Sequence, residues 1–161
     1  MSVMRRALPA GAAAVLLLTG SGAASAGGDG PAVAPESDVA HHGHVSLSDG
    51  RLRISLTTRN HGPAHLEDVT VRLSLSAAPV GAPRLPSECL RAGERDVLCA
   101  MGPLSADGLG RSTRLDLRMA GLPQEVVVRV GTVWNGGASD RNTENNEHRV
   151  LAPATGDRYV F

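Results

Sequence analysis

The sequence predicts an all-β protein, an immunoglobulin-like antiparallel sandwich of two sheets with about seven or eight strands. Apolar residues occupy every second position in 52–56 and again in 69–75, with Arg, Ser and Thr between them. This alternation is typical of strands that have one buried face and one wet face. Turn-forming residues separate the runs, and no stretch of ten residues shows a convincing helical period.

The first 26 residues are predicted to be a secretory signal peptide. Arg5-Arg6 precede an apolar run at 12–18, and Ala24-Ser25-Ala26 forms a small-x-small cleavage pattern. The run is shorter than the roughly 20 apolar residues that span a bilayer. We therefore expect cleavage near Gly27, by the general or the twin-arginine export route, and a secreted or extracellular product, loosely associated with the cell wall at most.

The composition of the exported chain excludes several classes of function. All 16 basic residues are Arg, so removal of Arg5 and Arg6 leaves 14 against 16 acidic residues, a net charge of −2. This balance argues against a nucleic-acid partner. The absence of Lys excludes Schiff-base chemistry and a P-loop. With one Trp, one Tyr and one Phe, the core must be aliphatic.

The elements are expected in the following order. Residues 27–38 lack periodicity and are predicted to be a disordered lead-in, and the sandwich is predicted over 39–152. A strand over 39–47 turns at Asp49-Gly50 into the 52–56 strand, which makes a hairpin. After the 69–75 strand, prolines in 77–86 indicate an irregular segment that crosses between the sheets.

Cys89 and Cys99 are predicted to form a disulfide, because a lone cysteine pair in an exported chain is normally oxidised. The turn formers at 92–95 would place the two sulfurs on adjacent strands. Beyond this hairpin, strands are expected at 115–119 and 126–130, with a bulge at Gly131 that turns Val133 toward the core. A polar loop over 135–146 leads to a last strand at 148–151, and 153–161 is predicted to be a C-terminal tail, either frayed or adding an edge contact.

The order of short motifs resembles the immunoglobulin-like conserved-repeat domain of bacterial cell-surface proteins, akin to the CARDB (cell-adhesion-related) type. The motifs cover roughly residues 45 to 150. They comprise Asn60, Gly62 to Ala64, Val69 to Val71, Cys89, Cys99, Leu104, Leu115, Leu117, Asp140, Asn142, Asn145 and Asn146. The resemblance implies a secreted or surface-attached sandwich that spaces or presents other modules, without catalytic residues. Family members often occur in tandem, whereas this sequence has one copy.

Histidines provide the strongest metal candidates. On a strand, His42 and His44 project from the same face, which suits two-imidazole binding of copper or zinc, and the Asn60 turn could bring His61 or His65 near. The alternative is a polar edge strand. A zinc helix motif is excluded because Gly62-Pro63 interrupts the His61 to His65 spacing.

Two other sites are weaker hypotheses. Residues 140–144 alternate oxygen donors as a calcium loop does, but the pattern then departs from the EF-hand, so a turn capped by Asp and Asn side chains is favoured. A hydrolase is disfavoured because no G-x-S-x-G elbow is present.

The predicted function is that of a non-catalytic interaction or structural module, with no cofactor. We expect a monomer whose partner is a protein or a cell-wall polymer, recognised by the loops 60–67, 77–86 and 135–146 or by a sheet edge. The alternative is an extracellular metal-binding protein that uses His42 and His44.

Overall fold

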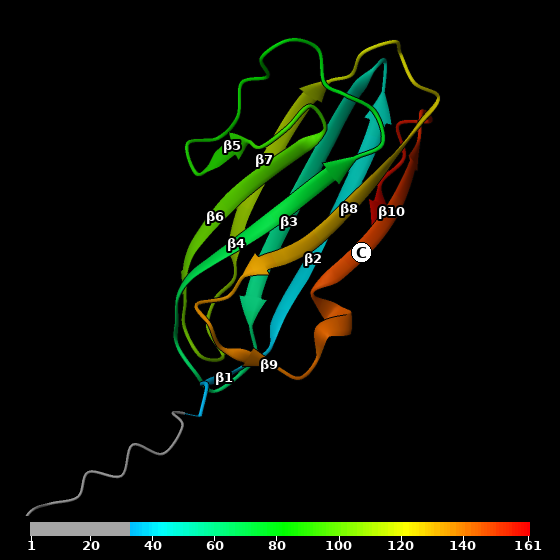
Figure 1. The fold of residues 1–161 in the computed structure, drawn as a ribbon. Coiled ribbons are helices and arrows are strands. Elements are labelled where there is room, and N and C mark those ends of the chain that lie inside the picture. Colours follow the sequence, from blue (N-terminus) through cyan, green and yellow to red (C-terminus); the bar gives the residue numbers. More distant parts are fainter. Residues whose placement is uncertain (1–32) are drawn as a thin grey trace, which may run out of the picture. The chain divides into compact units, whose positions relative to one another are not determined.

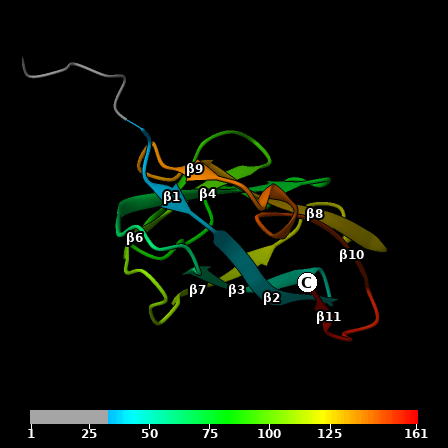
Figure 2. The ribbon, with the colours of Figure 1, turned by 90° about the horizontal axis from the view of Figure 1, so that it is seen from below.

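The computed structural model describes residues 33–161, which form two β-sheets packed face to face (Figure 1, Figure 2). The four-stranded sheet has the order β11-β2-β3-β7 and the five-stranded sheet the order β10-β8-β4-β6-β5. The bounds of the four strands are Tyr159–Val160, Val39–Ser48, Arg51–Asn60 and Arg111–Arg118. The bounds of the five strands are Glu147–Pro153, Glu125–Trp134, Leu66–Leu75, Asp96–Leu104 and Cys89–Arg91.

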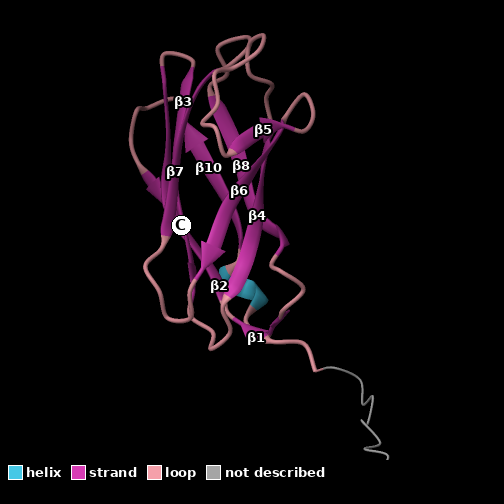
Figure 3. Ribbon diagram, turned by 90° about the vertical axis from the view of Figure 1, so that its left-hand side faces the viewer, coloured by secondary structure: helices cyan, strands magenta, loops and turns pink. Residues whose placement is uncertain are grey.

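Pairing within both sheets is antiparallel, and the all-β prediction is confirmed (Figure 3). A separate parallel pair joins β1 (Glu36–Ser37) to β9 (Ser139–Asp140), and a 3₁₀ turn, η1, covers Thr143–Asn145. The predicted signal peptide, 1–26, lies outside the described residues.

The core is aliphatic and lies between the two sheets, as the alternation predicted. Every second residue of β3 is buried, and so is every second residue of β4 from Val69 onward, after a shift in register between Leu66 and Val69. The buried apolar residues of the two strands are Leu52, Ile54, Leu56, Leu66, Val69, Val71, Leu73 and Leu75. Burial of each such side chain contributes about 1.5–3 kcal/mol, so these residues hold the sheets together.

The two predicted hairpins are present. Asp49 and Gly50 join β2 to β3 with φ of 50° and 68°, the left-handed conformation that a two-residue hairpin turn requires. Cys89 and Cys99 are directly opposite each other on β5 and β6 and form the predicted disulfide.

The 77–86 segment was predicted to cross between the sheets, but it leads from β4 to β5, which belong to the same sheet. On the way it contacts the end of the four-stranded sheet, where Val80 N–H donates to the Arg118 carbonyl at 2.7 Å. The prolines prevent regular strand pairing here but do not determine which sheet the chain rejoins.

Residues 35–38 are held in place, although 27–38 was predicted to be a disordered lead-in. Asn60 is buried, and its Oδ1 accepts hydrogen bonds from the N–H groups of Asp38 and Gly62 at 3.2 and 3.0 Å. A Cβ on Gly62 would lie 2.6 Å from the Ser37 and Asp38 backbone, so only glycine permits this close approach. Asp140 Oδ2 accepts from Val39 N–H at 2.8 Å. The Asn60–Asp38 and Asp140–Val39 partners are distant in sequence, so a local pattern does not reveal them.

The C-terminal tail belongs to the sandwich, which therefore extends beyond the predicted boundary at 152. β11 pairs with β2, and Phe161 and Gly43 exchange backbone hydrogen bonds of 3.1 Å. The Phe161 ring lies 5.3 Å from the His148 ring on β10. The tail thus covers the edge of β2. Of the two predicted possibilities, a frayed tail or an added edge contact, the structure has the edge contact.

Val133 does not face the core, contrary to prediction. Its side chain is 44% exposed, because β8 pairs with β4 in regular register through Gly131 and Thr132, so no bulge changes the alternation before Val133. Thr132 faces inward instead and contacts His41.

Candidate functional site

His42 and His44 lie on β2 with His42 exposed and His44 partly exposed, and both belong to the outward positions of the strand. The prediction that the two share a face agrees with this pattern. Within residues 33–161, no three or more His, Cys, Asp or Glu side chains are grouped to hold a metal ion. His61 and His65 therefore do not complete a three-ligand site with them. Metal binding by His42 and His44 alone stays a prediction.

The same outer face of the four-stranded sheet is rich in arginine. Its exposed positions on β3 and β7 include Arg51, Arg53, Arg59, Arg114 and Arg118, with Asp116 as their acidic neighbour. We call this set the arginine face. Arg51 is directly opposite Arg118, and Ser55 is opposite Arg114. Like charges directly opposite each other on a sheet are unfavourable, so the Arg51–Arg118 pair requires a carboxylate nearby.

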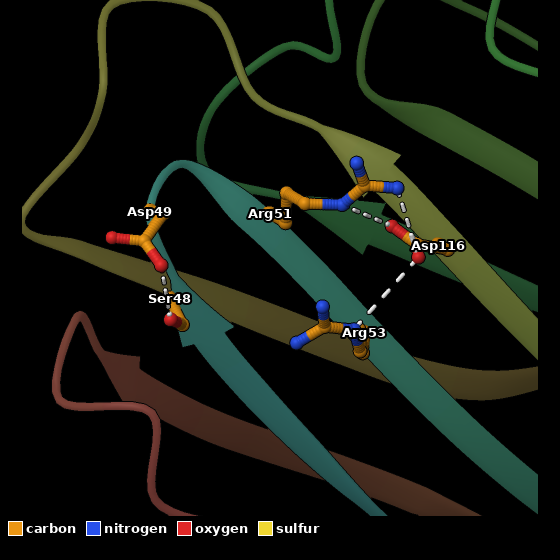
Figure 4. A network of polar contacts seen from close by, with 5 residues as sticks. All are labelled: Ser48, Asp49, Arg51, Arg53 and Asp116. Carbon is orange, nitrogen blue, oxygen red and sulfur yellow. Dashed lines mark hydrogen bonds and ion pairs between the residues drawn. The ribbon is translucent and has the colours of Figure 1, made fainter.

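Asp116 satisfies two of these arginines (Figure 4). Arg51 donates to both carboxylate oxygens of Asp116, from Nε at 3.2 Å and from Nη2 at 3.1 Å. These hydrogen bonds, followed by the charge of Asp116, raise the pKa of Arg51. Arg53 Nε lies 3.8 Å from Asp116 Oδ2. One carboxylate is thus shared by two guanidinium groups on β3.

Arg59, Arg114 and Arg118 form no ion pair with a carboxylate of the residues that the structure describes. Arg114 borders a shallow hollow of about 280 Å³ on this face. The hollow is lined by His44, Arg53, Ile54, Ser55, Arg114, Leu115 and Asp116. Its polar groups are therefore two guanidiniums, one carboxylate, one hydroxyl and one imidazole. Such a set can bind an anion and hydroxyl groups together.

The outer face of the five-stranded sheet differs in its charge balance. It has a larger hollow, about 440 Å³, lined in part by Arg72, Arg129 and Arg149. Glu147 lines the same hollow, and Asp96 and Glu125 occupy other outward positions of that sheet. Positive and negative groups are therefore mixed on this side, whereas the arginine face is basic.

His41 is the histidine whose role the sequence analysis missed. It is fully buried, with Nδ1 3.0 Å from Thr58 Oγ1 on β3 and Nε2 2.9 Å from Thr132 Oγ1 on β8, in the opposite sheet. Burial, with smaller contributions from His148 and His42, lowers its pKa to about 4. A signal was present, since His41 shares its parity with Val39 and Val45. The imidazole joins the two sheets in its neutral form.

The 140–146 loop uses its polar side chains as turn and bridge contacts, in agreement with the favoured interpretation. Asp140 Oδ1 accepts from Asn142 N–H at 2.9 Å, which makes an Asx turn. Asn146 Nδ2 donates to the other oxygen of Asp140 at 3.1 Å, and Asn145 Nδ2 donates to Asp38 Oδ1 at 2.8 Å. The loop therefore fastens the N-terminal strands to the end of the sandwich.

Comparisons with known proteins add little. No family model and no curated protein matches the sequence. One similar solved structure is β-glucosidase 3B from Thermotoga neapolitana in complex with α-D-glucose, with 14% identity and a TM-score of 0.39. The match covers 78% of this chain and 17% of the glucosidase chain. These values are too low to indicate a shared fold or activity. In residues 33–161, no helix has the length and apolar character needed to cross a membrane.

Proposed function

We propose that this protein is a non-catalytic binding module that acts outside the bacterial cell, on an immunoglobulin-like scaffold of the CARDB-like kind. The placement of β2, β3 and β7 in one sheet and β4, β8 and β10 in the other supports this, because it corresponds to strands A, B, E and C, F, G of such sandwiches. The disulfide is typical of an oxidising compartment.

The observation that carries the proposal is the arginine face. The full chain has a net charge of zero, yet five arginines and one aspartate occupy outward positions of two adjacent strands. A neutral protein that concentrates positive charge on one face attracts negatively charged partners to that face. The partner is therefore anionic.

The loops that the sequence favoured as the recognition surface are not grouped together. Loops 60–67 and 135–146 adjoin β1 and β9 at one end of the sandwich, and 77–86 lies at the other end (Figure 1). Hydrogen bonds from Asn60 and Asn135 engage the first two loops in structural contacts. The sheet face is thus the more continuous surface for binding.

The test uses matched charge removals on the two faces. Purified protein, the double variant Arg114→Gln/Arg118→Gln and the control Arg129→Gln/Arg149→Gln are immobilised and exposed to cell-wall material of the producing bacterium. We expect native protein and control to retain the same anionic material and the arginine-face variant to lose most of it. Equal retention by all three proteins would contradict the proposal.

A further inference from the structure

We propose that the hollow on the arginine face binds one unit of an acidic polysaccharide, a sugar that carries a carboxylate. This inference rests on the proposed function and specifies its partner. The hollow is lined by polar side chains from three adjacent strands: His44 on β2, Arg53 and Ser55 on β3, and Arg114 and Asp116 on β7.

Arg114 is the group that would bind the sugar carboxylate. It is exposed, forms no ion pair with the described carboxylates and stands directly opposite Ser55. Guanidinium groups bind carboxylates through two parallel N–H donors. The same face already shows this geometry, because Arg51 holds Asp116 in that way. Arg114 therefore offers an incoming carboxylate the contact that Arg51 makes within the chain.

The other groups around the hollow suit hydroxyl groups. Asp116 accepts hydrogen bonds, and the Ser55 hydroxyl and the His44 imidazole can each donate or accept. A polyphosphate would use the arginines alone, and a neutral sugar would leave Arg114 without a charge partner. The combination of cation, acceptor and hydroxyl matches a sugar acid. The volume of about 280 Å³ is just below that of the smallest drug-sized pockets, which corresponds to a single unit.

The positive charge continues beyond the hollow, which indicates a polymer rather than a free sugar. Outward residues two positions apart on a strand are separated by about 7 Å, so Arg51 lies one such step from Arg53 on β3, whereas Asp116 stands between Arg114 and Arg118 on β7. Arg118 lies toward the hairpin end of the face and Arg59 toward its other end. Val160, opposite His44 on β11, is the large apolar residue exposed beside the hollow. A single valine is a poor membrane anchor, which favours a polysaccharide over a lipid surface.

The experiment is a calorimetric titration of the purified protein with oligogalacturonate and oligoglucuronate. Methyl-esterified oligogalacturonate provides the same sugar without charge, and polyphosphate provides charge without sugar. We expect at least one of the acidic oligosaccharides to bind at least ten-fold more tightly than the ester and than polyphosphate. Arg114→Gln should weaken binding about ten-fold and Ser55→Ala several-fold, whereas the opposite-face control Arg129→Gln should leave it unchanged.

Several outcomes would overturn the inference. Equal binding of the ester, tighter binding of polyphosphate, equal effects of Arg114→Gln and Arg129→Gln, or absence of binding to both acidic oligosaccharides would each contradict it. If, in any of these cases, the arginine-face variant still retains less cell-wall material than the control variant of the opposite face, the proposed function stands. Only the sugar acid is then excluded as the partner. If that difference is absent as well, both fail.

Discussion

His41 shows at the scale of a single residue how this fold combines a polar group with an aliphatic core. The imidazole lies between Thr58 and Thr132, which belong to different sheets, and both ring nitrogens have a hydroxyl partner. Buried polar groups are tolerated when they are hydrogen-bonded, and the geometry that satisfies them is specific. His41 therefore contributes to the alignment of the two sheets as long as it remains neutral.

This arrangement predicts a loss of stability in acid. In the unfolded chain His41 protonates near its ordinary pKa of about 6.5, whereas in the folded protein it stays neutral down to about 4. The unfolded state binds more protons in this window, so the free energy of unfolding falls as the pH decreases from about 6.5 to 4, by roughly 3 kcal/mol in total. Below that range the loss is complete, and above it the group has no effect.

Urea unfolding at several pH values checks this prediction. His41→Gln retains a donor and an acceptor for the two threonines but does not titrate, so its free energy of unfolding should fall less steeply between pH 6.5 and 4 than that of the native protein. Parallel pH profiles for the two proteins would show that His41 is not the group responsible.

Asn60 is the second residue whose contacts extend far along the chain. Its side chain accepts from Asp38 and Gly62 N–H and donates to the Ala64 carbonyl at 2.6 Å. Asn60→Ala should lower the free energy of unfolding by about 2–4 kcal/mol, because one buried and two partly buried backbone groups lose their partner. The matched control is Asn142→Ala at an exposed position, which should cost less than about 0.5 kcal/mol. Similar losses in thermal or urea unfolding of the two variants would contradict this role.

At the scale of elements, short segments at both ends of the described residues complete the sandwich. β1 pairs with β9, and β11 pairs with β2. Gly43 on β2 lies close to Phe161, since a Cβ there would be 2.9 Å from the Phe161 ring and 2.0 Å from the Ser55 carbonyl oxygen. The two terminal segments are thus part of the folded unit, not linkers.

The β5–β6 hairpin should depend on its disulfide. Replacement of Cys89 and Cys99 by Ala should lower the free energy of unfolding by about 3 kcal/mol, because the cross-link restricts the unfolded chain. Thermal unfolding with and without reductant measures this effect, and reductant should not change the variant. If both cysteines of the unsubstituted protein are alkylated after denaturation without reductant, the disulfide is disproved.

At the scale of the whole molecule, charge is distributed unevenly between the two outer faces. The arginine face is basic, whereas Asp96, Glu125 and Glu147 offset the arginines of the opposite face. The aliphatic core between the sheets does not depend on these charges. The proposed binding therefore depends on surface charge, whereas folding depends on the aliphatic core.

This separation predicts that salt weakens binding but not folding. Raising NaCl from about 0.05 to 0.5 M reduces the Debye length from roughly 14 to 4 Å, so binding of an anionic polymer should weaken by at least ten-fold. The thermal midpoint should move by only a few degrees, since exposed ion pairs such as Arg51–Asp116 contribute little to stability. Calorimetry and thermal unfolding in the same buffers test this. Salt-insensitive affinity would exclude the arginine face as the binding surface.

Features that depend on residues close together in the chain are predictable from the sequence. Alternation at 52–56 and 69–75 predicts strands with one buried face, Asp49-Gly50 predicts the hairpin turn, and a lone cysteine pair flanking the turn formers at 92–95 predicts the disulfide. Each is encoded within about ten residues, because strand periodicity and turn chemistry are local properties. His42 and His44 were likewise assigned to one face by their spacing.

The identity of neighbouring strands, in contrast, follows from the folded arrangement of the chain. The arginine face combines β3 with β7, the 77–86 segment returns to its own sheet, and residues 35–38 and 159–161 pair with distant strands. Period-two alternation shows that a residue points inward or outward but does not indicate what lies beside it. The partners of His41, Asn60 and Arg114 are set by contacts between segments far apart in the chain, and the candidate site arises from those contacts.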